Sequence, residues 1–483
     1  MPLLFPRTFL DGRACAFYNA TMDHALIQKF IAIVGEKNAI TDKDMQVPYL
    51  REWRDMWRGV TPVILRPANT DEVSSILKLA HETGTKIVPQ SGNTGLVNGQ
   101  IPLGDEVLLS LDRMTRIINV NAADNSITVE GGCILQRVQD AADGVDRQLG
   151  LSLASEGSCR IGGNLSTNAG GLNVLAFGPA RDQCLGLEIV LADGRVWNGL
   201  KSLRKDNTGY DLKDLFIGAE GTLGVITAAV LKLYPKPKRH DTAMCAVPSP
   251  EAALHLLNLM RGESGNRLVA FELMPEIGMG FAVKHLHAVN PLTTPSPWYV
   301  LFEAADANMG AIEDGLGKAL EQGLVTDAAL AQNETQRKSF WNVRECLSES
   351  QKFEGGSIKH DVSVPISQLP DFIDAASKAV AKFMPSARVV CFGHMGDGNM
   401  HYNVTQPIGM DKQEYLDLWR GMNDVVFGEV LKRQGSISAE HGIGRLKVVD
   451  MPHIKTPLEL ELMRGIKNLL DPKGILNPGR VLP

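Results

Sequence analysis

Residues 157–182, GSCRIGGNLSTNAGGLNVLAFGPARD, contain six glycines and few large apolar side chains. Two other stretches are also rich in glycine, VPQSGNTGLV at 88–97 and LFIGAEGTLGVIT at 215–227. Glycine loops of this kind bring backbone amides close to phosphates, although they also mark tight corners in β-rich folds. Three such loops within about 130 residues favour a large phosphate-bearing cofactor over simple corners.

The sequence around these loops excludes the two common nucleotide-binding motifs. No G-x-G-x-x-G opens a helix after a strand, and no G-x-x-x-x-G-K-[ST] occurs. Residues 62–96 instead predict a strand, a helix and a second strand that leads into the loop at 91–95. Upstream, HALIQKFIAIVG at 24–35 predicts an amphipathic helix within a helical segment over 22–56.

Composition narrows the class of protein. The 483 residues are 44% hydrophobic and 22% charged, which predicts a globular protein of two or three domains. A net charge of −6 without a basic cluster argues against nucleic-acid binding, and no apolar run is long enough for a transmembrane segment. Seven scattered cysteines without a C-x-x-C motif argue against a disulfide framework or an iron–sulfur site.

The first twenty residues, MPLLFPRTFLDGRACAFYNA, lack the clean apolar core of a secretory signal. We therefore predict a cytoplasmic (bacterial) protein, with the mitochondrial matrix as the alternative. Translation could begin at Met1 or at Met22.

The segment GHMGDGNMHYN at 393–403 places two histidines around a run of turn formers. The flanking residues are β-branched and aromatic, so we predict a hairpin that brings His394 and His401 together. Two imidazoles on stiff backbone suit a divalent metal, and Glu440 in SAEHGIG is the candidate carboxylate ligand. From spacing alone, hydrogen-bonded structural histidines remain the commoner alternative.

Seven motifs in order resemble the FAD-dependent D-2-hydroxyacid dehydrogenases of the vanillyl-alcohol-oxidase-type (PCMH) flavoprotein superfamily. They are VPQSGNTGLV, GSCRIGGNLSTNAGG, LGLEIVLADGRVW, SLRKDNTGYDLKDLFIGAEGTLGVIT, GHMGDGNMHYN, SAEHGIGRLK and LDPKGILNPGRVLP. The run SLRKDNTGYDLK is most similar to the D-2-hydroxyglutarate dehydrogenase branch. The motifs extend from about residue 60 to the end of the chain.

The resemblance implies an α+β fold. An FAD-binding PCMH-type domain of two α+β subdomains would span 1–236, and a substrate (cap) domain with an antiparallel sheet and helices would span 237–437. Residues 438–483 would return to the FAD domain. The linker LYPKPKRHD at 233–241 supports the first boundary by itself, because prolines and basic residues are common between domains.

The resemblance also implies the cofactor contacts. The residues that would bind FAD are Gln90, Ser91, Gly92, Asn93, Thr94, Gly95, Gly157, Ser158, Gly162, Gly163, Asn164, Thr167, Asn168, Gly170, Glu220, Gly224, Ile226 and Asn477. No histidine stands in the first loop, where some relatives carry a covalent link to the flavin, so we predict non-covalent FAD.

For the reaction, the resemblance implies oxidation of D-2-hydroxyglutarate to 2-oxoglutarate by hydride transfer from C2 to flavin N5. A divalent metal, Zn²⁺ first and Mn²⁺ or Fe²⁺ next, would be held by His394, His401 and Glu440 and would act on the substrate hydroxyl and carboxylate. His441 would be the general base, at a bend permitted by Gly442 and Gly444.

Substrate binding would come from Arg344, Ser348, Lys359 and Asn403, where Ser348 replaces the usual threonine. Without the resemblance, Arg344 and Lys359 would be taken for a solvated helix face and an ordinary surface pair.

Other functions on the same fold are also open to the sequence. A D-lactate or glycolate dehydrogenase would lack the pocket for a second carboxylate, and an ether-lipid synthase-type flavotransferase would not oxidise its substrate. A non-catalytic flavin-binding subunit would need neither His441 nor the ligand set. Because no nicotinamide or iron–sulfur motif occurs, we expect electrons to leave to an electron-transferring flavoprotein or a quinone. A homodimer is expected on base rates alone.

Overall fold

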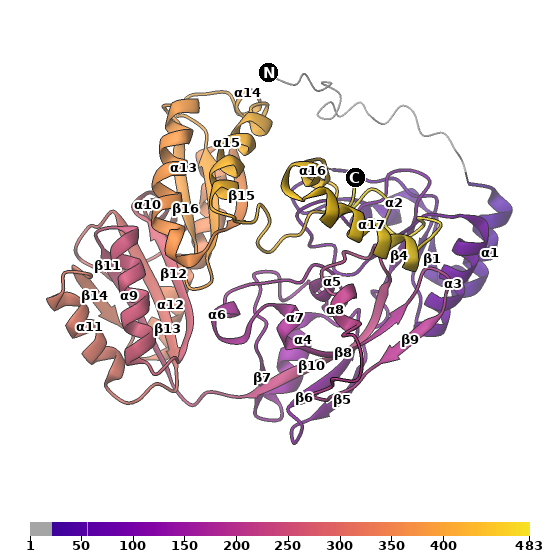
Figure 1. Cartoon of the computed structure of the whole chain (residues 1–483), viewed down its shortest axis with the longest axis horizontal. Helices are drawn as coiled ribbons and strands as arrows, with labels where there is room; N and C mark the ends of the chain where they lie inside the picture. Colours follow the sequence, from indigo (N-terminus) through magenta and orange to yellow (C-terminus); the bar gives the residue numbers. More distant parts are fainter. Residues whose placement is uncertain (1–21, 56) are drawn as a thin grey trace.

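The computed structural model describes residues 22–55 and 57–483, so the predictions about residues 1–21 lie outside the described part. Within these ranges the chain forms three sheets flanked by helices, arranged in two lobes (Figure 1). The N-terminal lobe carries the first two sheets, and the C-terminal lobe carries the third. The predicted α+β architecture is confirmed.

The first sheet has the strand order β1-β2-β4-β3. Its elements are α1 (His24–Val34), η1 (Glu36–Asn38), β1 (Ala39–Ile40), α2 (Lys43–Leu50), β2 (Ile64–Leu65), α3 (Thr70–Thr83), β3 (Ile87–Gln90) and β4 (Val107–Ser110). Strands β2, β4 and β3 run parallel and are largely buried, as expected when helices and loops cover both faces. Strand β3 delivers the loop at 91–95, as the sequence predicted.

The predicted helical segment over 22–56 is wrong as a continuous element. Helix α1 ends at Val34 because Gly35 adopts φ +79°, outside the helical region. Strand β1 then pairs with β2 before α2 begins at Lys43. A local apolar period cannot reveal this interruption, because the pairing partner of β1 lies about 25 residues downstream.

The second sheet has the order β5-β6-β10-β8-β9, and β7 pairs with β10. Its elements are β5 (Ile117–Asn121), β6 (Ser126–Glu130), α4 (Leu135–Asp143), β7 (Arg147–Leu149), α5 (Ile161–Ser166), α6 (Val174–Phe177), α7 (Ala180–Gln183), β8 (Cys184–Val190), β9 (Val196–Gly199), α8 (Lys213–Phe216) and β10 (Val225–Pro235). The glycine-rich stretch at 157–182 therefore becomes three short helices joined by loops. These lie beside the sheet rather than in it.

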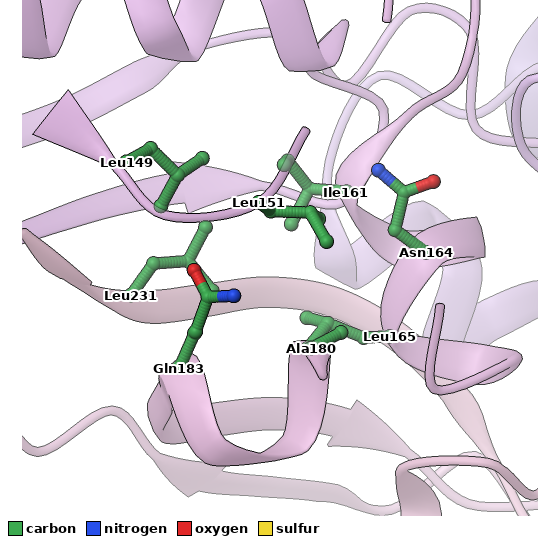
Figure 2. A pocket seen from close by; sticks show the side chains of 8 residues that line it. All are labelled: Leu149, Leu151, Ile161, Asn164, Leu165, Ala180, Gln183 and Leu231. Carbon is green, nitrogen blue, oxygen red and sulfur yellow. The ribbon is translucent and has the colours of Figure 1, made fainter. Parts of the chain in front are cut away.

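Between β7, α5, α7 and β10 lies a cavity of about 10 Å³, enough for one water molecule (Figure 2). Leucine side chains dominate its lining, together with Asn164 and Gln183. A separate hollow of about 360 Å³ lies near Pro365, Asp397 and Gln434. Neither lining includes a predicted metal ligand or substrate-binding residue.

The third sheet has the order β14-β11-β13-β12-β16-β17-β15 and is antiparallel throughout. Its strands are β11 (His240–Val247), β12 (Leu268–Pro275), β13 (Trp298–Ala305), β14 (Asp327–Leu330), β15 (Ser357–Ser363), β16 (Arg388–His394) and β17 (Asn399–Thr405). Its helices are α9 (Pro250–Glu263), α10 (Glu276–Leu286), α11 (Ala311–Glu321), α12 (Glu334–Ser350), η2 (Gln351–Glu354), η3 (Ile366–Gln368), α13 (Leu369–Phe383), α14 (Lys412–Leu416) and α15 (Trp419–Lys432).

The two faces of this sheet are packed differently. One face forms a large core with α9, α11, α13 and α15, and includes Tyr402 and Val362. The opposite face packs against α10 and α12 through Val390 and Phe392. Along each strand, the neighbours of the large-core residues point to the opposite face. This second face also carries the predicted site.

The C-terminal tail, with η4 (Val448–Asp450), α16 (Met451–Ile454) and α17 (Pro457–Leu470), lies on the N-terminal lobe (Figure 1). Leu476 forms a parallel bridge with Ile87, and the Asn477 amide donates to the Ile87 carbonyl at 2.9 Å. The buried Arg480 guanidinium contacts Glu106 at 2.6 Å. Among the described helices, none is long and apolar enough to cross a membrane.

Candidate active site

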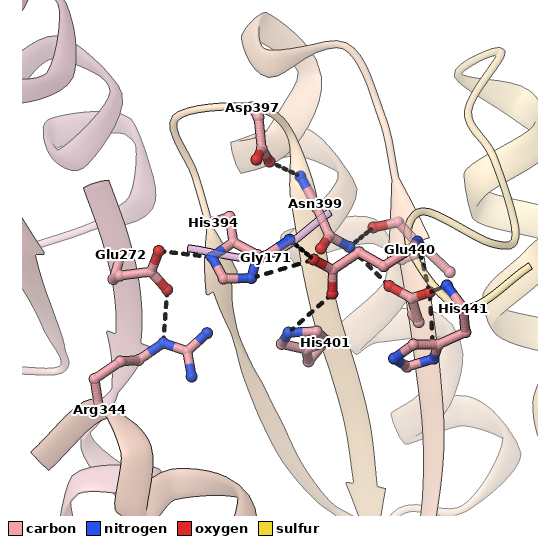
Figure 3. Close-up of polar contacts among 11 residues, drawn as sticks. Gly171, Glu272, Arg344, His394, Asp397, Asn399, His401, Glu440 and His441 are labelled. Carbon is pink, nitrogen blue, oxygen red and sulfur yellow. Dashed lines mark hydrogen bonds and ion pairs between the residues drawn. The ribbon is translucent and has the colours of Figure 1, made fainter. Parts of the chain in front are cut away.

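The predicted hairpin forms between β16 and β17, and its register aligns the polar side chains. His394 faces Asn399, while His401 faces Phe392 on β16 and Asp361 on β15. Directly paired residues share a face, as do residues two apart along a strand. His394, His401 and Asp361 therefore project from the same face. Figure 3 shows the two histidines on it.

Glu440 completes a group of three donors with the two histidines. Its carboxylate lies 3.8 Å from His394 Nε2 and 4.0 Å from His401 Nε2. Figure 3 shows the carboxylate between the two rings. One ligand atom from each residue lies within 4.8 Å of the others. The structure thus brings together the ligands that the sequence predicted.

These three residues could hold a divalent metal if their donor atoms moved slightly closer together. Bonds of about 2.0–2.1 Å in a tetrahedral zinc site separate the donors by about 3.4 Å, somewhat less than the separations here. Two imidazoles and a carboxylate leave one or more coordination positions for substrate, as catalytic sites require. The donor set suits Zn²⁺ and also Mn²⁺ or Fe²⁺.

Glu272, which the sequence reasoning missed, orients His394. Strand β12 pairs with β16 at these two residues, and Glu272 Oε1 lies 2.7 Å from His394 Nδ1. Burial lowers the pKa of His394, but the Glu272 carboxylate more than offsets this and raises it to about 9. A carboxylate behind a histidine fixes the ring and its tautomer in metal sites. Nε2 of His394 is thereby directed at Glu440.

Arg344 joins the same network from α12. Its Nε donates to Glu272 Oε2 at 2.6 Å, and its guanidinium carbon lies 4.8 Å from the centroid of the Phe392 ring. Despite burial, His394 and Arg344 hold the pKa of Glu272 near 2. Figure 3 shows the terminal nitrogens of Arg344 directed toward His401, where they can bind a substrate carboxylate.

Asp361 is the second residue that the sequence reasoning missed, and it holds His441. Its Oδ2 lies 3.3 Å from His441 Nδ1 and accepts from the backbone amides of Glu440 and His441 at 2.9 and 3.0 Å. Asn399 Nδ2 donates to its other oxygen at 3.0 Å. With Nδ1 directed to Asp361, Nε2 of His441 is left to accept a proton. Burial lowers the pKa of His441, which favours the neutral, proton-accepting ring.

The bend that lets Glu440 and His441 serve one site is held by the N-terminal lobe. Gly442 and Gly444 have φ of +80° and +51°. Glu220 accepts from the amides of Ile443 and Gly444, each at 2.7 Å. A Cβ on Gly442 would lie 2.6 Å from Glu220 Oε1, so glycine is required there. The Glu220 side chain thus binds this loop, and its predicted contact with the cofactor remains a prediction.

The predicted metal ligand Glu440 also contacts the second glycine segment. The Gly171 amide donates to Glu440 Oε1 at 2.6 Å. A Cβ on the neighbouring Gly170 would lie 2.7 Å from the same oxygen. The loop predicted to contact the cofactor therefore touches a predicted metal ligand.

The predicted cofactor loops converge in the N-terminal lobe. A Cβ on Gly92 would lie 2.7 Å from the Ser158 carbonyl, one on Gly162 would lie 2.9 Å from the Gly131 carbonyl, and one on Gly163 would lie 3.3 Å from Ser91 Cβ. The loops at 91–95 and 157–163 are therefore in contact through bare backbone. Such a cradle presents amides to phosphates, which fits FAD.

Unsatisfied buried polar atoms also fit a bound cofactor. Asn477 donates from Nδ2 to the Glu220 carbonyl at 2.7 Å, but its Oδ1 has no partner. Both side-chain polar atoms of the buried Asn98 also lack partners. Buried polar atoms are usually hydrogen-bonded, so these atoms are candidates to contact a ligand.

The side chains of several predicted cofactor residues contact the protein itself. Gln90 Nε2 donates to the carbonyls of Tyr49 and Gln100. Gly224 packs against Ile189, where a Cβ would lie 2.6 Å from a methyl group, and Ile226 is buried in β10. Asn93 donates to the Pro48 carbonyl, and Asn168 accepts from the Arg181 amide. The side chains of Ser158, Asn164 and Thr167 bond to residues 155–163 nearby. Their backbone groups, and those of Thr94, Gly95 and Gly157, remain the predicted contacts.

The remaining predicted substrate residues lie around the same sheet face. Lys359 pairs with Asn403 on the strands that carry Asp361 and His401, two positions away. Asn403 donates to Gln351 Oε1 at 3.1 Å, and Ser348 is exposed on α12 one turn after Arg344. Burial, followed by the nearby charges of Arg54 and Lys352, lowers the pKa of Lys359 to about 8. Arg54 was not predicted from the sequence.

We expect the flavin to be released by denaturation. The first loop at 91–95 contains no histidine, cysteine or tyrosine that could form a covalent link. After acid precipitation, the yellow chromophore is expected in the supernatant, measured by its absorbance. Colour retained in the washed pellet would contradict non-covalent binding.

Comparisons with known proteins identify the family. Residues 61–199 match the FAD binding domain family, and residues 236–481 match the family described as FAD linked oxidases, C-terminal domain. The chain is 40% identical over 448 residues to a mitochondrial D-2-hydroxyglutarate dehydrogenase of Danio rerio, covering 92% of this chain and 83% of the relative. It is 32% identical to a D-2-hydroxyglutarate dehydrogenase of Stutzerimonas stutzeri, covering 95% and 99%. A putative mitochondrial D-lactate dehydrogenase of Schizosaccharomyces pombe is 35% identical, covering 94% and 89%.

Two solved structures share the fold. A p-cresol methylhydroxylase superposes with a TM-score of 0.74 at 17% identity, over 94% of this chain and 96% of the other. An alkyldihydroxyacetonephosphate synthase gives 0.71 at 17% identity, over 95% and 85%. Together with the sequence relatives, these matches show that the chain belongs to the FAD-dependent D-2-hydroxyacid dehydrogenases of the vanillyl-alcohol-oxidase-type flavoprotein superfamily.

Proposed function

We propose that the protein oxidises D-2-hydroxyglutarate to 2-oxoglutarate with FAD and a divalent metal. The observation that carries this proposal is the convergence of His394, His401 and Glu440 with the His441–Asp361 pair on one sheet face, beside several cations. The names of relatives from Danio rerio and Stutzerimonas stutzeri support the substrate.

The proposed reaction uses both cofactors and side chains of the protein. Bound FAD would accept the hydride that leaves C2, and a metal held by His394, His401 and Glu440 would lower the pKa of the substrate hydroxyl. His441 Nε2 would take the hydroxyl proton, while Asp361 keeps Nδ1 occupied and stabilises the protonated ring. Two electrons and one proton leave C2 as hydride, and the second proton leaves through His441.

The cations around the site favour a dicarboxylate. Arg344 reaches the site from α12, and Lys359 projects from β15 on the same sheet face. A monocarboxylate such as D-lactate offers one anionic group, and its binding leaves one of these cations without an anion. We therefore rank a D-lactate or glycolate dehydrogenase as the second candidate function. The name of the Schizosaccharomyces pombe relative, a putative D-lactate dehydrogenase, supports it. The likeness to an ether-lipid enzyme is one of fold alone.

Partners and location are proposed on less direct grounds. An electron-transferring flavoprotein or a quinone would take the electrons from FAD, and a homodimer remains a base-rate expectation. The relatives from animals and plants are named mitochondrial, whereas the Stutzerimonas stutzeri relative is not. The printed word mitochondrial supports the mitochondrial alternative, and the cytoplasm stays our expectation for a bacterial source.

The decisive experiment is anaerobic reduction of the purified flavoprotein. D- and L-2-hydroxyglutarate, D- and L-lactate and glycolate are mixed with the enzyme, before and after chelation, and flavin absorbance is followed. Rapid bleaching by D-2-hydroxyglutarate, lost on chelation and restored by Zn²⁺ or Mn²⁺, is the expected result. Bleaching by D-lactate alone would move the function to the alternative. Absence of bleaching by every hydroxyacid would reject dehydrogenase activity.

Replacing Arg344 is expected to weaken substrate binding. Arg344→Ala should raise KM for D-2-hydroxyglutarate about 10- to 100-fold, because a charge-assisted hydrogen bond is lost. It also removes a partner of Glu272, so Arg344→Lys is the sharper variant: it keeps a positive charge near Glu272 but loses the planar fork. Arg337→Lys is the control, because Arg337 lies on the same helix and binds Glu303 instead. An unchanged KM in both Arg344 variants would assign this residue to structure.

A further inference from the structure

The end of α12 contacts β17 through a buried glutamine. Gln351 follows the last residue of the helix and begins η2. Its side chain is 1% exposed, so its amide nitrogen and oxygen need partners inside the protein. Gln351 Nε2 donates to the Leu347 carbonyl at 2.7 Å, and Gln351 Oε1 accepts from Asn403 Nδ2 at 3.1 Å. One side chain thus joins α12 to a strand of the predicted site.

The Leu347 carbonyl fixes which way round the Gln351 amide lies. The last carbonyls of a helix lack backbone donors, and the backbone amide of Gln351 bonds to the Glu349 carbonyl instead. The Leu347 carbonyl receives side-chain donors, namely Gln351 Nε2 and the Ser350 hydroxyl at 3.3 Å. Because a carbonyl can only accept, the amide nitrogen of Gln351 must face Leu347 and its oxygen must face Asn403.

The orientation of the Asn403 amide follows from that of Gln351. Gln351 presents an oxygen, so Asn403 must present its NH₂ group on that side. This group carries two hydrogens, and Gln351 takes one of them. Asn403 lies directly opposite Lys359 on β15, so the two side chains share a face. The pair of His401 and Asp361 lies two residues further along the same strands and on the same face.

Lys359 and the oriented Asn403 together favour a carboxylate. An ammonium group has three donors and no acceptor, and the NH₂ group of Asn403 has one hydrogen left. Donors side by side match the oxygens of a carboxylate, which only accept. Without Gln351, the Asn403 amide could turn its oxygen toward the same ligand, and that oxygen would repel a carboxylate.

We propose that Gln351 is a positioning residue that holds Asn403 as a hydrogen-bond donor to a carboxylate of the substrate. This inference rests on the proposed function for the identity of the acid, and it adds a residue that the predicted substrate contacts do not include. Gln351 acts through Asn403, and a backbone carbonyl of α12 sets the direction of both hydrogen bonds. The helix that supplies Arg344 therefore also orients a donor on β17.

A double-mutant cycle tests whether the two amides act as a unit. 2-Oxoglutarate is titrated into each FAD-loaded protein by calorimetry, which requires no turnover. Gln351→Met keeps the length of the side chain and removes its hydrogen bonds, so it should weaken binding about 3- to 10-fold. In an Asn403→Ala background, the same substitution should change the Kd less than twofold. An equal factor in both backgrounds, or no change in either, would overturn the proposal.

Two further variants test the polarity of Asn403 and the integrity of the helix end. Asn403→Asp should weaken 2-oxoglutarate binding more than Asn403→Ala, because an acceptor replaces the donor. An equal or smaller loss would contradict the proposal, even if Gln351→Met fails to fold. Ser350→Ala is the matched control, since the buried Ser350 hydroxyl donates to the same Leu347 carbonyl. Its Kd should stay within twofold of the wild type, and a loss equal to that of Gln351→Met would overturn the proposal.

Flavin reduction separates this inference from the proposed function. Gln351→Met should raise KM for D-2-hydroxyglutarate by the factor found for binding and leave kcat within twofold, because the predicted base and metal ligands are unchanged. If D-2-hydroxyglutarate bleaches the flavin but the cycle shows no coupling, the inference alone is rejected. Coupling in a protein that no hydroxyacid bleaches would uphold the inference and reject the proposed reaction. A wild type that does not bind 2-oxoglutarate would overturn both.

Discussion

Glu440→Gln is expected to remove the bound metal and to lower kcat by about 10³-fold or more. The variant keeps the size of the side chain and leaves an oxygen that can accept from the Gly171 amide, so the loop should stay in place. It loses the negative charge that a divalent cation requires beside two neutral imidazoles. Removing a residue behind a metal ligand typically costs 10- to 100-fold in affinity, and removing a ligand should cost more.

Metal content and turnover are measured on the same preparations. Elemental analysis gives the metal per flavin, and anaerobic flavin reduction gives the rate. Glu429→Gln is a suitable control, because Glu429 binds Lys432 and Arg433 at the end of α15, outside the site. Full metal content with a rate within tenfold of the wild type would show that Glu440 is not a ligand.

His441→Gln is expected to lower kcat about 10²- to 10⁴-fold while the metal stays bound, because a positioned general base contributes a factor of this size. Asp361→Asn should also lower kcat strongly. An asparagine NH₂ group turned toward the amides of Glu440 and His441 would repel them, and the His441 tautomer would no longer be fixed.

Three measurements together identify the base. Flavin reduction gives kcat and KM, and elemental analysis confirms that metal is retained in His441→Gln. Thermal unfolding of His441→Gln and of the exposed His453→Gln should be alike, with normal turnover only in the second variant. If His441→Gln kept its rate, the proton would have to be taken by another group.

The hairpin at 388–405 could be predicted because its signal is local. β-branched residues flank a run of turn formers, and Gly398 adopts φ +89° where a Cβ would lie 2.4 Å from the Val364 carbonyl. Alternation along β17 then places His401 and Asn403 on one face. The register that sets His401 opposite Phe392, rather than opposite His394, could not be predicted without the turn geometry.

Residues that reach the site through long-range pairing are not marked by a local motif. Glu272 lies more than 100 residues before His394 in an apolar strand, and only the pairing of β12 with β16 brings them together. Asp361 sits in KHDVSVP, where several polar residues alternate and none stands out. Arg54 belongs to a loop rich in charged residues, and it is partly buried. A buried acid inside an apolar strand is a signal that could have directed attention to Glu272.

The contacts of the N-terminal lobe with Glu440 and with the loop after His441 would make the cofactor and the proposed metal thermodynamically linked ligands. The hydrogen bond from Gly171 to Glu440 and the two bonds from Ile443 and Gly444 to Glu220 tie the predicted flavin loops to the metal ligands. A ligand that orders one set of loops therefore lowers the entropy cost of binding at the other. By reciprocity, FAD would strengthen the affinity for the proposed metal by the same factor by which the metal strengthens FAD affinity, and each tenfold would correspond to about 1.4 kcal/mol of coupling free energy.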